Sequence, residues 1–254
     1  MPSAGYEIQI LENPEALGRR AAELFVHQAG EAVKTKGTFT VALAGGSTPK
    51  GLYSLLASKD SSFRTQIPWD KTHFFWGDER HVRPGHIDSN YRMVYEVLLS
   101  KAPVPPENVH RIRAENQDAG RVAEDYERSL HDFFQLAEGE MPGFDLVLLG
   151  MGADGHTASL FPGTALPLEQ GRSVAALWVE KFKAYRISLT PASLNNAAYV
   201  TFLVSGSEKA EALRKVLQED ESSEILPARL IHPSDGRLLW LVDRAAASRL
   251  EPSG

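Results

Sequence analysis

The chain has 254 residues, and its 27 Lys and Arg against 33 Asp and Glu give a formal net charge of −6 at pH 7. A chain this acidic cannot neutralise a phosphate backbone by bulk charge, which argues against non-specific nucleic-acid binding and against docking on an anionic membrane. The absence of cysteine excludes disulfide frameworks, thiolate zinc sites and thiol nucleophiles.

Length and hydrophobicity set the expected organisation. At about 150 residues per domain, an α/β fold of this length commonly forms one unit, so we expect a single domain over residues 1–254. The longest apolar runs, 146–149 and 238–242, fall far below the ~20 residues needed to span a bilayer. The first residues show no basic segment followed by an apolar stretch, so we expect no targeting signal and a cytoplasmic location.

The first predicted element is a long helix. Asn13 and Pro14 are typical of a helix N-terminus, with proline at the first helical position. Apolar residues then recur at helical spacing as far as Val33, which indicates that one face is buried. Gly37 is expected to end this helix.

Strands and helices alternate along the rest of the chain. Apolar runs that lead into glycine-rich or polar turns predict strands at 38–44, 72–76, 144–149, 198–204 and 238–242. Helices are predicted at 52–56, 90–100 and 208–217, with a short helix at the C-terminal end. Strands that are apolar throughout imply burial on both faces. The sequence therefore predicts an α/β fold: a doubly wound, mostly parallel sheet with helices on both faces.

The first candidate site is the turn Gly45-Gly46-Ser47-Thr48-Pro49, between a predicted strand and a predicted helix. Exposed backbone N–H groups and two hydroxyls suit a phosphate or a carboxylate there. The alternative is that the glycines only make the turn and Ser47 or Thr48 caps the helix. The spacing does not match a P-loop, which needs a lysine, or a nucleophile elbow, which needs glycine where Pro49 stands.

Four ionisable residues, Asp78-Glu79-Arg80-His81, follow the predicted strand 72–76. Such a run is usually a solvated loop. Its place at the carboxyl end of a strand also suits a carboxylate and an arginine that hold a charged substrate group. His81, His86 and Asp88 show no recognised metal-ligand spacing, so we expect no metal site.

The glycine-rich segment 150–157 follows the predicted strand 144–149 and contains the spacing G-x-G-x-x-G. We expect no dinucleotide cofactor, because residues 160–163 (LFPG) break the chain where a helix should follow. What remains is Asp154 two residues before His156. Histidine is the usual proton-transfer group near neutral pH, and a carboxylate can fix its tautomer. The alternative is a histidine that is simply hydrogen-bonded within a loop.

Four basic residues could bind an anion at the same sheet edge: Lys181, Lys183 and Arg186, which precede the strand-like 187–190, and Lys209. Each of them is more often a solvated surface charge. Lys209 has the stronger case, because a strand, a glycine turn and a helix surround it. The tryptophans Trp69, Trp178 and Trp240 are expected in the core.

Three strings carry a resemblance to a known family: ALAGGSTPKGLY (42–53), FFWGDERHV (74–82) with SNYRM (89–93), and LLGMGADGHTASLFPG (148–163). In order and spacing they resemble the 6-phosphogluconolactonase family over essentially the whole chain. The family's sheet is similar to that of glucosamine-6-phosphate deaminase. Deaminases read D-E-Y where this chain has Asp78-Glu79-Arg80, and carry a glutamate where it has Phe161-Pro162. Both differences favour the lactonase.

The resemblance implies hydrolysis of 6-phospho-D-glucono-1,5-lactone to 6-phosphogluconate in the oxidative pentose phosphate pathway, without a metal or a cofactor. It implies His156 as the general base, with Asp154 in the same motif and Arg80 in the D-E-R loop. The residues expected to bind substrate are Gly45, Gly46, Ser47, Thr48, Asp78, Lys183, Arg186 and Lys209. Whether Lys181 or Lys183 reaches the substrate stays open, because the family often has a Lys-Pro-Pro stretch there.

Two other functions stay open. One is an aminosugar-phosphate deaminase or isomerase, and the other is a non-catalytic sugar-phosphate sensor on the same fold. The expected partner is a small phosphorylated sugar lactone, with no nucleic acid and no membrane. We expect a monomer or a weak homodimer.

Overall fold

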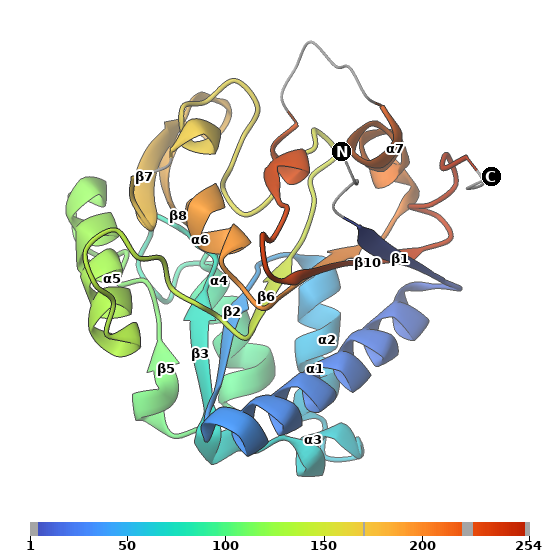
Figure 1. Ribbon diagram of the computed structural model, residues 1–254, viewed down its shortest axis with the longest axis horizontal. Coiled ribbons are helices and arrows are strands. Elements are labelled where there is room, and N and C mark those ends of the chain that lie inside the picture. The colour runs from blue at the N-terminus through green and yellow to red at the C-terminus, as the bar shows by residue number, and fades with distance from the viewer. Residues whose placement is uncertain (1–4, 170, 220–225, 252–254) are drawn as a thin grey trace.

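The computed structural model describes residues 5–169, 171–219 and 226–251, and its central element is a seven-stranded sheet (Figure 1). The strands lie in the order β1-β10-β9-β6-β2-β3-β5, and every neighbouring pair is parallel. All carboxyl ends therefore lie at one edge. The strands are β1 (Tyr6–Leu11), β2 (Phe39–Leu43), β3 (Thr72–Trp76), β5 (Val109–His110), β6 (Leu146–Leu149), β9 (Tyr199–Val204) and β10 (Arg237–Asp243).

The α-helices of the described residues are α1 (Pro14–Lys36), α2 (Ser47–Ala57), α3 (Phe63–Gln66), α4 (Asn90–Val94), α5 (Ala119–Phe134), α6 (Pro191–Asn195) and α7 (Ala210–Gln218). The helix α4 continues as a π-helical turn, Tyr95–Leu99. Short 3₁₀ turns lie at Trp69–Lys71, Pro106–Asn108, Leu166–Leu168, Glu180–Phe182, Ser207–Lys209 and Pro227–Leu230.

Helices cover both faces of the sheet (Figure 1). On one face, Phe25 of α1 meets Phe39 of β2 edge-on, with ring centroids 5.3 Å apart. Phe39 is paired with Thr72 in the next strand, so Phe75, three residues further along β3, lies on the opposite face. There it packs against Phe133 of α5, with centroids 5.0 Å apart. The predicted doubly wound parallel sheet is confirmed.

Both ends of α1 confirm the sequence signals. The side chain of Asn13 accepts a hydrogen bond from the Ala16 N–H at 2.9 Å, as an N-cap does. At the other end Gly37 has φ 82°, a left-handed conformation that glycine adopts without steric cost, and its N–H bonds the carbonyl of Val33.

A second, antiparallel sheet was not predicted. It has the order β4-β8-β7, formed by β4 (Asp78–Arg80), β7 (Val174–Val179) and β8 (Ala184–Leu189). Gly77 joins the two sheets: its N–H donates to Leu43 O at 2.9 Å, and its carbonyl accepts from the Leu189 N–H at 2.8 Å. Interpreting 78–81 as a solvated loop is therefore wrong for its first two residues, since Asp78 and Glu79 are buried.

Three further features differ from the sequence prediction. Residues 244–249 form turns rather than a short helix. Trp178 lies on the hairpin of the second sheet and is 45% exposed, whereas Trp69 and Trp240 are buried as predicted. The strand β1 and the helix α5 were not predicted, although Asp118 caps α5 through the Arg121 N–H.

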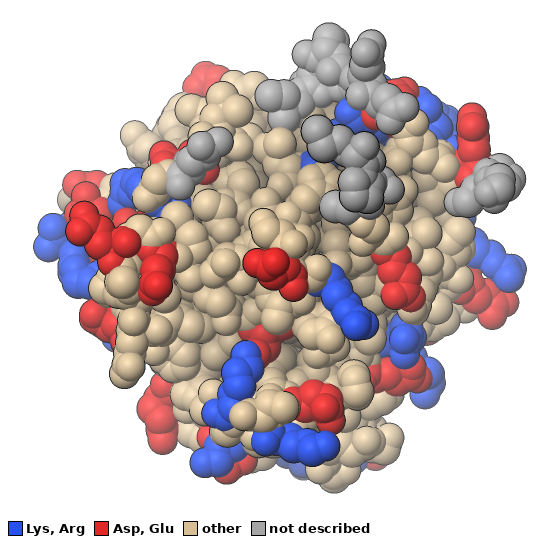
Figure 2. Space-filling view, in the orientation of Figure 1, with Lys and Arg blue, Asp and Glu red and all other residues tan. Residues whose placement is uncertain are grey.

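No helix among the described residues is long and apolar enough to cross a membrane. On the face shown in Figure 2, Lys and Arg are interspersed with Asp and Glu around the rim and form no continuous basic band. That face offers a polyanion no extended cationic track.

Candidate active site

Three loops and one strand at the carboxyl edge of the large sheet surround a cavity of about 210 Å³. They are the turn into α2, the loop after β6, the loop after β9 and the strand β4. The structure thus brings together most of the residues that the sequence singled out, namely Gly45, Gly46, Ser47, Thr48, Asp78, Arg80, His156 and Lys209.

The chemistry of this cavity centres on the pair Asp154 and His156. Oδ1 of Asp154 accepts a hydrogen bond from Nδ1 of the imidazole, and Oδ2 accepts one from Nζ of Lys181 at 3.3 Å. Because Nδ1 donates to the carboxylate, Nε2 of the neutral ring carries the free lone pair. Burial raises the pKa of Asp154, but the hydrogen bonds from His156 and Lys181 outweigh it and lower the pKa to about 2. The carboxylate is therefore ionised at neutral pH.

The glycines of this loop make room for the pair. The Gly152 N–H donates to His156 O at 2.8 Å, and Gly155 turns the chain with φ 75°. A Cβ on Gly152 would stand 2.5 Å from Oδ1 of Asp154 and closer still to the imidazole, so only glycine fits there without displacing them. Phe161 packs against the ring of His156, with centroids 4.5 Å apart. The segment runs on in turns rather than in a helix.

Hydrogen bonds to Asp78 connect the second sheet to the loop after β6 that carries His156. Its Oδ2 accepts a 2.7 Å hydrogen bond from the Ser159 hydroxyl, and its Oδ1 accepts one from the Asn90 amide at 3.3 Å. Asn90 also lies against Gly45, where a Cβ would come within 2.6 Å of the amide carbon. Sequence reasoning did not single out Asn90 or Ser159, although both lie within the strings that carry the family resemblance.

The neighbouring carboxylate, Glu79, braces the start of α4. It accepts hydrogen bonds from the backbone N–H groups of Arg80, Asn90 and Tyr91 at 2.7–2.8 Å and from the Ser89 hydroxyl at 3.0 Å. Burial raises the pKa of Glu79, and the backbone hydrogen bonds oppose that rise. Since its oxygens are occupied within the protein, Glu79 positions α4 rather than a ligand.

Two arginines lie side by side in the small sheet, of which Arg80 lines the cavity and Arg186 does not. Arg80 and Arg186 are paired neighbours on β4 and β8. Arg80 Nη1 donates to Asp88 O at 3.1 Å, and its buried Nε has no partner among the described residues. The Arg186 guanidinium lies over the ring of Phe182, 5.0 Å from its centroid. Burial, with the charge of Arg80, lowers the pKa of Arg186. Among the described residues both side chains donate to backbone carbonyls, Arg80 to Asp88 and Arg186 to Tyr185, and not to a carboxylate, so an anion would relieve their repulsion.

A third positive feature is the turn into α2 together with Lys209. Gly46 has φ 102° and leads directly into Ser47, and no side chain caps this helix end. Its first backbone N–H groups and the helix dipole are therefore available to an anion. Lys209 lines the same cavity from the loop after β9, which is anchored by Gly206 N–H donating to the buried carboxylate of Asp243.

The two candidate lysines, Lys181 and Lys183, lie on the β7–β8 hairpin and have different partners. Lys183 pairs with Glu180, has a side chain that is 72% exposed, and does not line the cavity. Lys181 contacts Asp154 instead. The prediction that Lys183 binds substrate thus finds no geometric support in this conformation.

Candidate metal ligands do not gather anywhere in residues 5–169, 171–219 and 226–251. His81 bonds the carbonyl of Asn116 at 2.6 Å, and His86 lies 3.6 Å from the carboxylate of Asp88. These side chains have protein partners of their own.

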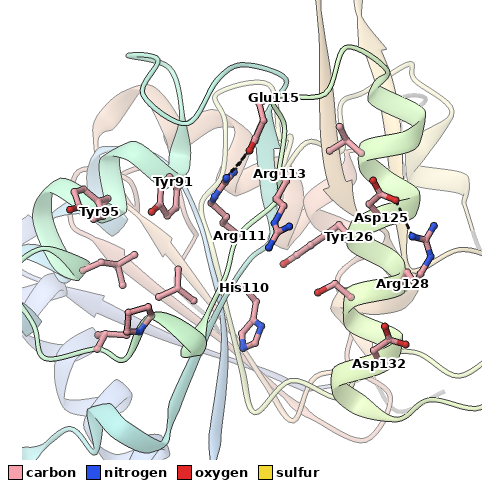
Figure 3. A pocket seen from close by; sticks show the side chains of 16 residues that line it. Tyr91, Tyr95, His110, Arg111, Arg113, Glu115, Asp125, Tyr126, Arg128 and Asp132 are labelled. Carbon is pink, nitrogen blue, oxygen red and sulfur yellow. Dashed lines mark hydrogen bonds and ion pairs between the residues drawn. The ribbon is translucent and has the colours of Figure 1, made fainter.

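A larger cavity, of about 970 Å³, lies between the end of α4, the segment after β5, and α5 (Figure 3). Two of its three arginines pair with carboxylates on its own walls, Arg111 with Glu115 and Arg128 with Asp125. No proton-transfer pair such as Asp154 and His156 lines it. Chemistry therefore favours the smaller cavity as the candidate active site.

Comparisons with known proteins agree with this fold. Residues 12–240 match the model of the family described as glucosamine-6-phosphate isomerases/6-phosphogluconolactonase. A 6-phosphogluconolactonase of Nostoc sp. is 40% identical over 243 residues, covering 96% of this chain and 98% of that protein.

Two solved structures extend the comparison. The 6-phosphogluconolactonase of Trypanosoma brucei matches with a TM-score of 0.86 and 30% identity, covering 98% of this chain and all of that one. A monomeric glucosamine-6-phosphate deaminase shares the fold with a TM-score of 0.79 at 22% identity, covering 96% of this chain and 99% of that one. The chain belongs to the glucosamine-6-phosphate isomerase/6-phosphogluconolactonase family.

Proposed function

We propose that this protein hydrolyses 6-phospho-D-glucono-1,5-lactone to 6-phospho-D-gluconate. The relatives named 6-phosphogluconolactonase, at 30–40% identity over nearly the full length, support this substrate. Within the structure, the observation that carries the proposal is the Asp154–His156 pair at a cavity whose other walls hold Arg80, Lys209 and the start of α2.

The proposed reaction needs one general base. Nε2 of His156 takes a proton from water as the water oxygen attacks the lactone carbonyl. The bond between the carbonyl carbon and the ring oxygen then breaks, and the ring oxygen takes up the proton. Asp154 holds the ring by Nδ1 and stabilises the imidazolium that forms in between. Because a lactone is an activated ester, neither a covalent nucleophile nor a metal is required.

Positive groups would serve the two ends of the substrate. We propose Arg80 or backbone N–H groups of the surrounding loops as donors to the developing oxyanion. The Gly45-Gly46 turn with Ser47 and Thr48, together with Lys209, lines the cavity and would hold the phosphate. Arg186, beside Arg80 but outside the lining, would add its charge. Binding the phosphate far from the reacting carbon fixes the carbonyl near His156, and this positioning lowers the barrier.

The test is the variant His156→Ala in a coupled assay with glucose-6-phosphate dehydrogenase and 6-phosphogluconate dehydrogenase, corrected for spontaneous hydrolysis of the lactone. Loss of a general base should lower kcat by roughly 10²-fold or more. His131→Ala, on the exposed surface of α5, is the matched control and should retain full activity. Unchanged turnover in a folded His156→Ala protein would refute the assignment.

The other functions have their own readouts. A deaminase would release ammonia from glucosamine 6-phosphate, but here Phe161 packs against His156 where deaminases carry a glutamate. A sensor would bind 6-phosphogluconate without turning over the lactone. Location in the cytoplasm and a monomeric or weakly dimeric state stay predictions from the sequence, and sedimentation analysis tests the latter.

A further inference from the structure

The tip of the β7–β8 hairpin contacts the Asp154–His156 pair at two points. The 3₁₀ turn Glu180–Phe182 joins the strands, and from it Lys181 Nζ reaches Oδ2 of Asp154. Phe182 packs on Phe161, with centroids 5.7 Å apart, and Phe161 in turn covers the imidazole of His156.

Lys181 approaches Asp154 from the side away from the substrate cavity. The cavity of about 210 Å³ is lined by His156 but not by Lys181. A separate cavity of about 470 Å³ is lined by both Lys181 and Asp154. Asp154 therefore lies between the lysine and the histidine, with one oxygen bonded to each.

On the basis of the proposed function, we propose that Lys181 is a positioning residue that acts on His156 through Asp154, and not a substrate ligand. One ammonium proton fixes the orientation of the carboxylate, so that its other oxygen meets Nδ1. The lysine charge also offsets part of the carboxylate charge that the imidazole experiences. Lys181 thereby weakens the electrostatic stabilisation that Asp154 gives the imidazolium formed during the reaction.

Other charges near the pair do not share this position. Among the described residues, those that line the cavity with His156 are Asp78, Arg80 and Lys209, and those that line the second cavity with Asp154 are Glu180, Glu211 and Lys215. Lys215 faces Glu211 at 3.9 Å, and Lys183 pairs with Glu180. The hydrogen bond from Lys181 also contributes to the low pKa of Asp154.

The test compares Lys181→Met with Lys183→Met, a matched change two residues away on the same hairpin. Profiles of kcat/KM against pH are measured with the lactone at low ionic strength. In general, a unit charge about 6 Å from an ionisable group shifts the protonation of that group by about half a pH unit even at the dielectric constant of water. Lys181→Met should therefore move the acid limb about half a pH unit upward, while Lys183→Met leaves it in place. Lys181→Arg should restore the limb, and added salt should reduce the shift.

Three outcomes would overturn the proposal. A several-fold rise in KM at every pH with a fixed acid limb would make Lys181 a substrate ligand. A lower kcat with an unchanged acid limb of the kcat/KM profile would show that Lys181 has only a structural role. Unchanged kcat, KM and acid limb would show that Lys181 has no role in the reaction. Failure of the proposed function would show separately, as absence of lactone turnover in the unaltered protein.

Discussion

Replacing Gly152 with alanine tests whether the Asp154–His156 geometry limits the reaction. The new Cβ would stand 2.5 Å from Oδ1 of Asp154, whereas ordinary contacts begin near 3.4 Å, and the imidazole would be closer still. The pair must therefore move by roughly 1 Å. A displacement of that size costs about 10²-fold in rate when reacting groups have to be aligned.

We expect kcat/KM for the lactone to fall by roughly 10²-fold in Gly152→Ala. Stability should change little, because the pair lies half-exposed at a loop and not in the core. Gly85→Ala is the control, since a Cβ there meets nothing within 4 Å, its φ is not positive and it does not line the cavity. The coupled assay gives kcat and KM, and thermal unfolding gives stability. A loss below threefold, or an equal loss in Gly85→Ala, would refute the reasoning.

Three further predictions concern binding, stability and pH. Lys209→Met should raise KM for the phosphorylated lactone by roughly 10-fold, because one charge-assisted hydrogen bond is lost. Hydrolysis of unphosphorylated gluconolactone should stay unchanged. Equal effects on both substrates would contradict a phosphate-binding role for Lys209. Asp145→Ala removes the carboxylate that accepts from Thr40 N–H at 2.9 Å and from the Thr40 hydroxyl at 3.0 Å. It should lower the free energy of unfolding by about 2–3 kcal/mol in urea titrations with kcat unchanged, and a loss under about 0.5 kcal/mol would count against it. Burial first, and then the neighbouring imidazole of His73, lower the pKa of His110 from its ordinary 6.5 to about 4. The contribution of the neutral His110 to folding stability is therefore complete above pH 6.5 and is lost as the pH falls toward 4. In His110→Phe the free energy of unfolding should fall by about 1–2 kcal/mol less over this pH range, a value that allows for solvent screening. An unchanged slope of unfolding free energy against pH between about pH 7 and 4.5 would refute this prediction.

Local chemistry predicted much of the large sheet. Asn13 and Gly37 mark the ends of α1 because a side-chain cap and a left-handed glycine act within a few residues. Uniformly apolar runs marked β2, β3, β6, β9 and β10, because parallel strands covered on both faces tolerate few polar side chains. The parallel order then placed the candidate loops at one edge.

The small sheet was missed because its stability comes from distant partners. The strand β4 has only three residues, all of them charged, which locally is typical of a loop. Asp78 can be buried there only because Ser159 and Asn90 donate to it from other segments. A pattern within one stretch of sequence carries no information about such donors.

The choice between Lys181 and Lys183 shows a similar limit within the site. Two residues apart on an extended strand, both lysines would point the same way. Lys183 instead has φ 48° at the end of the hairpin turn, so the chain reverses and its side chain pairs with Glu180. The 3₁₀ turn Glu180–Phe182 and the positive φ of Lys183, which the sequence does not reveal at a non-glycine residue, together separate the two lysines.

Gly77, where the two sheets meet, divides the site between two structural units. His156 follows a strand of the large sheet, whereas Arg80 and Arg186 belong to the small sheet. At the junction Gly77 makes hydrogen bonds with Leu43 and Leu189, and Ser159 of the His156 loop donates to Asp78 of the small sheet. These contacts between the two units, and not either sheet alone, set the span between the proposed base and the two guanidinium groups. Substitutions that alter these contacts would change that span, and with it the length of substrate that the site accepts.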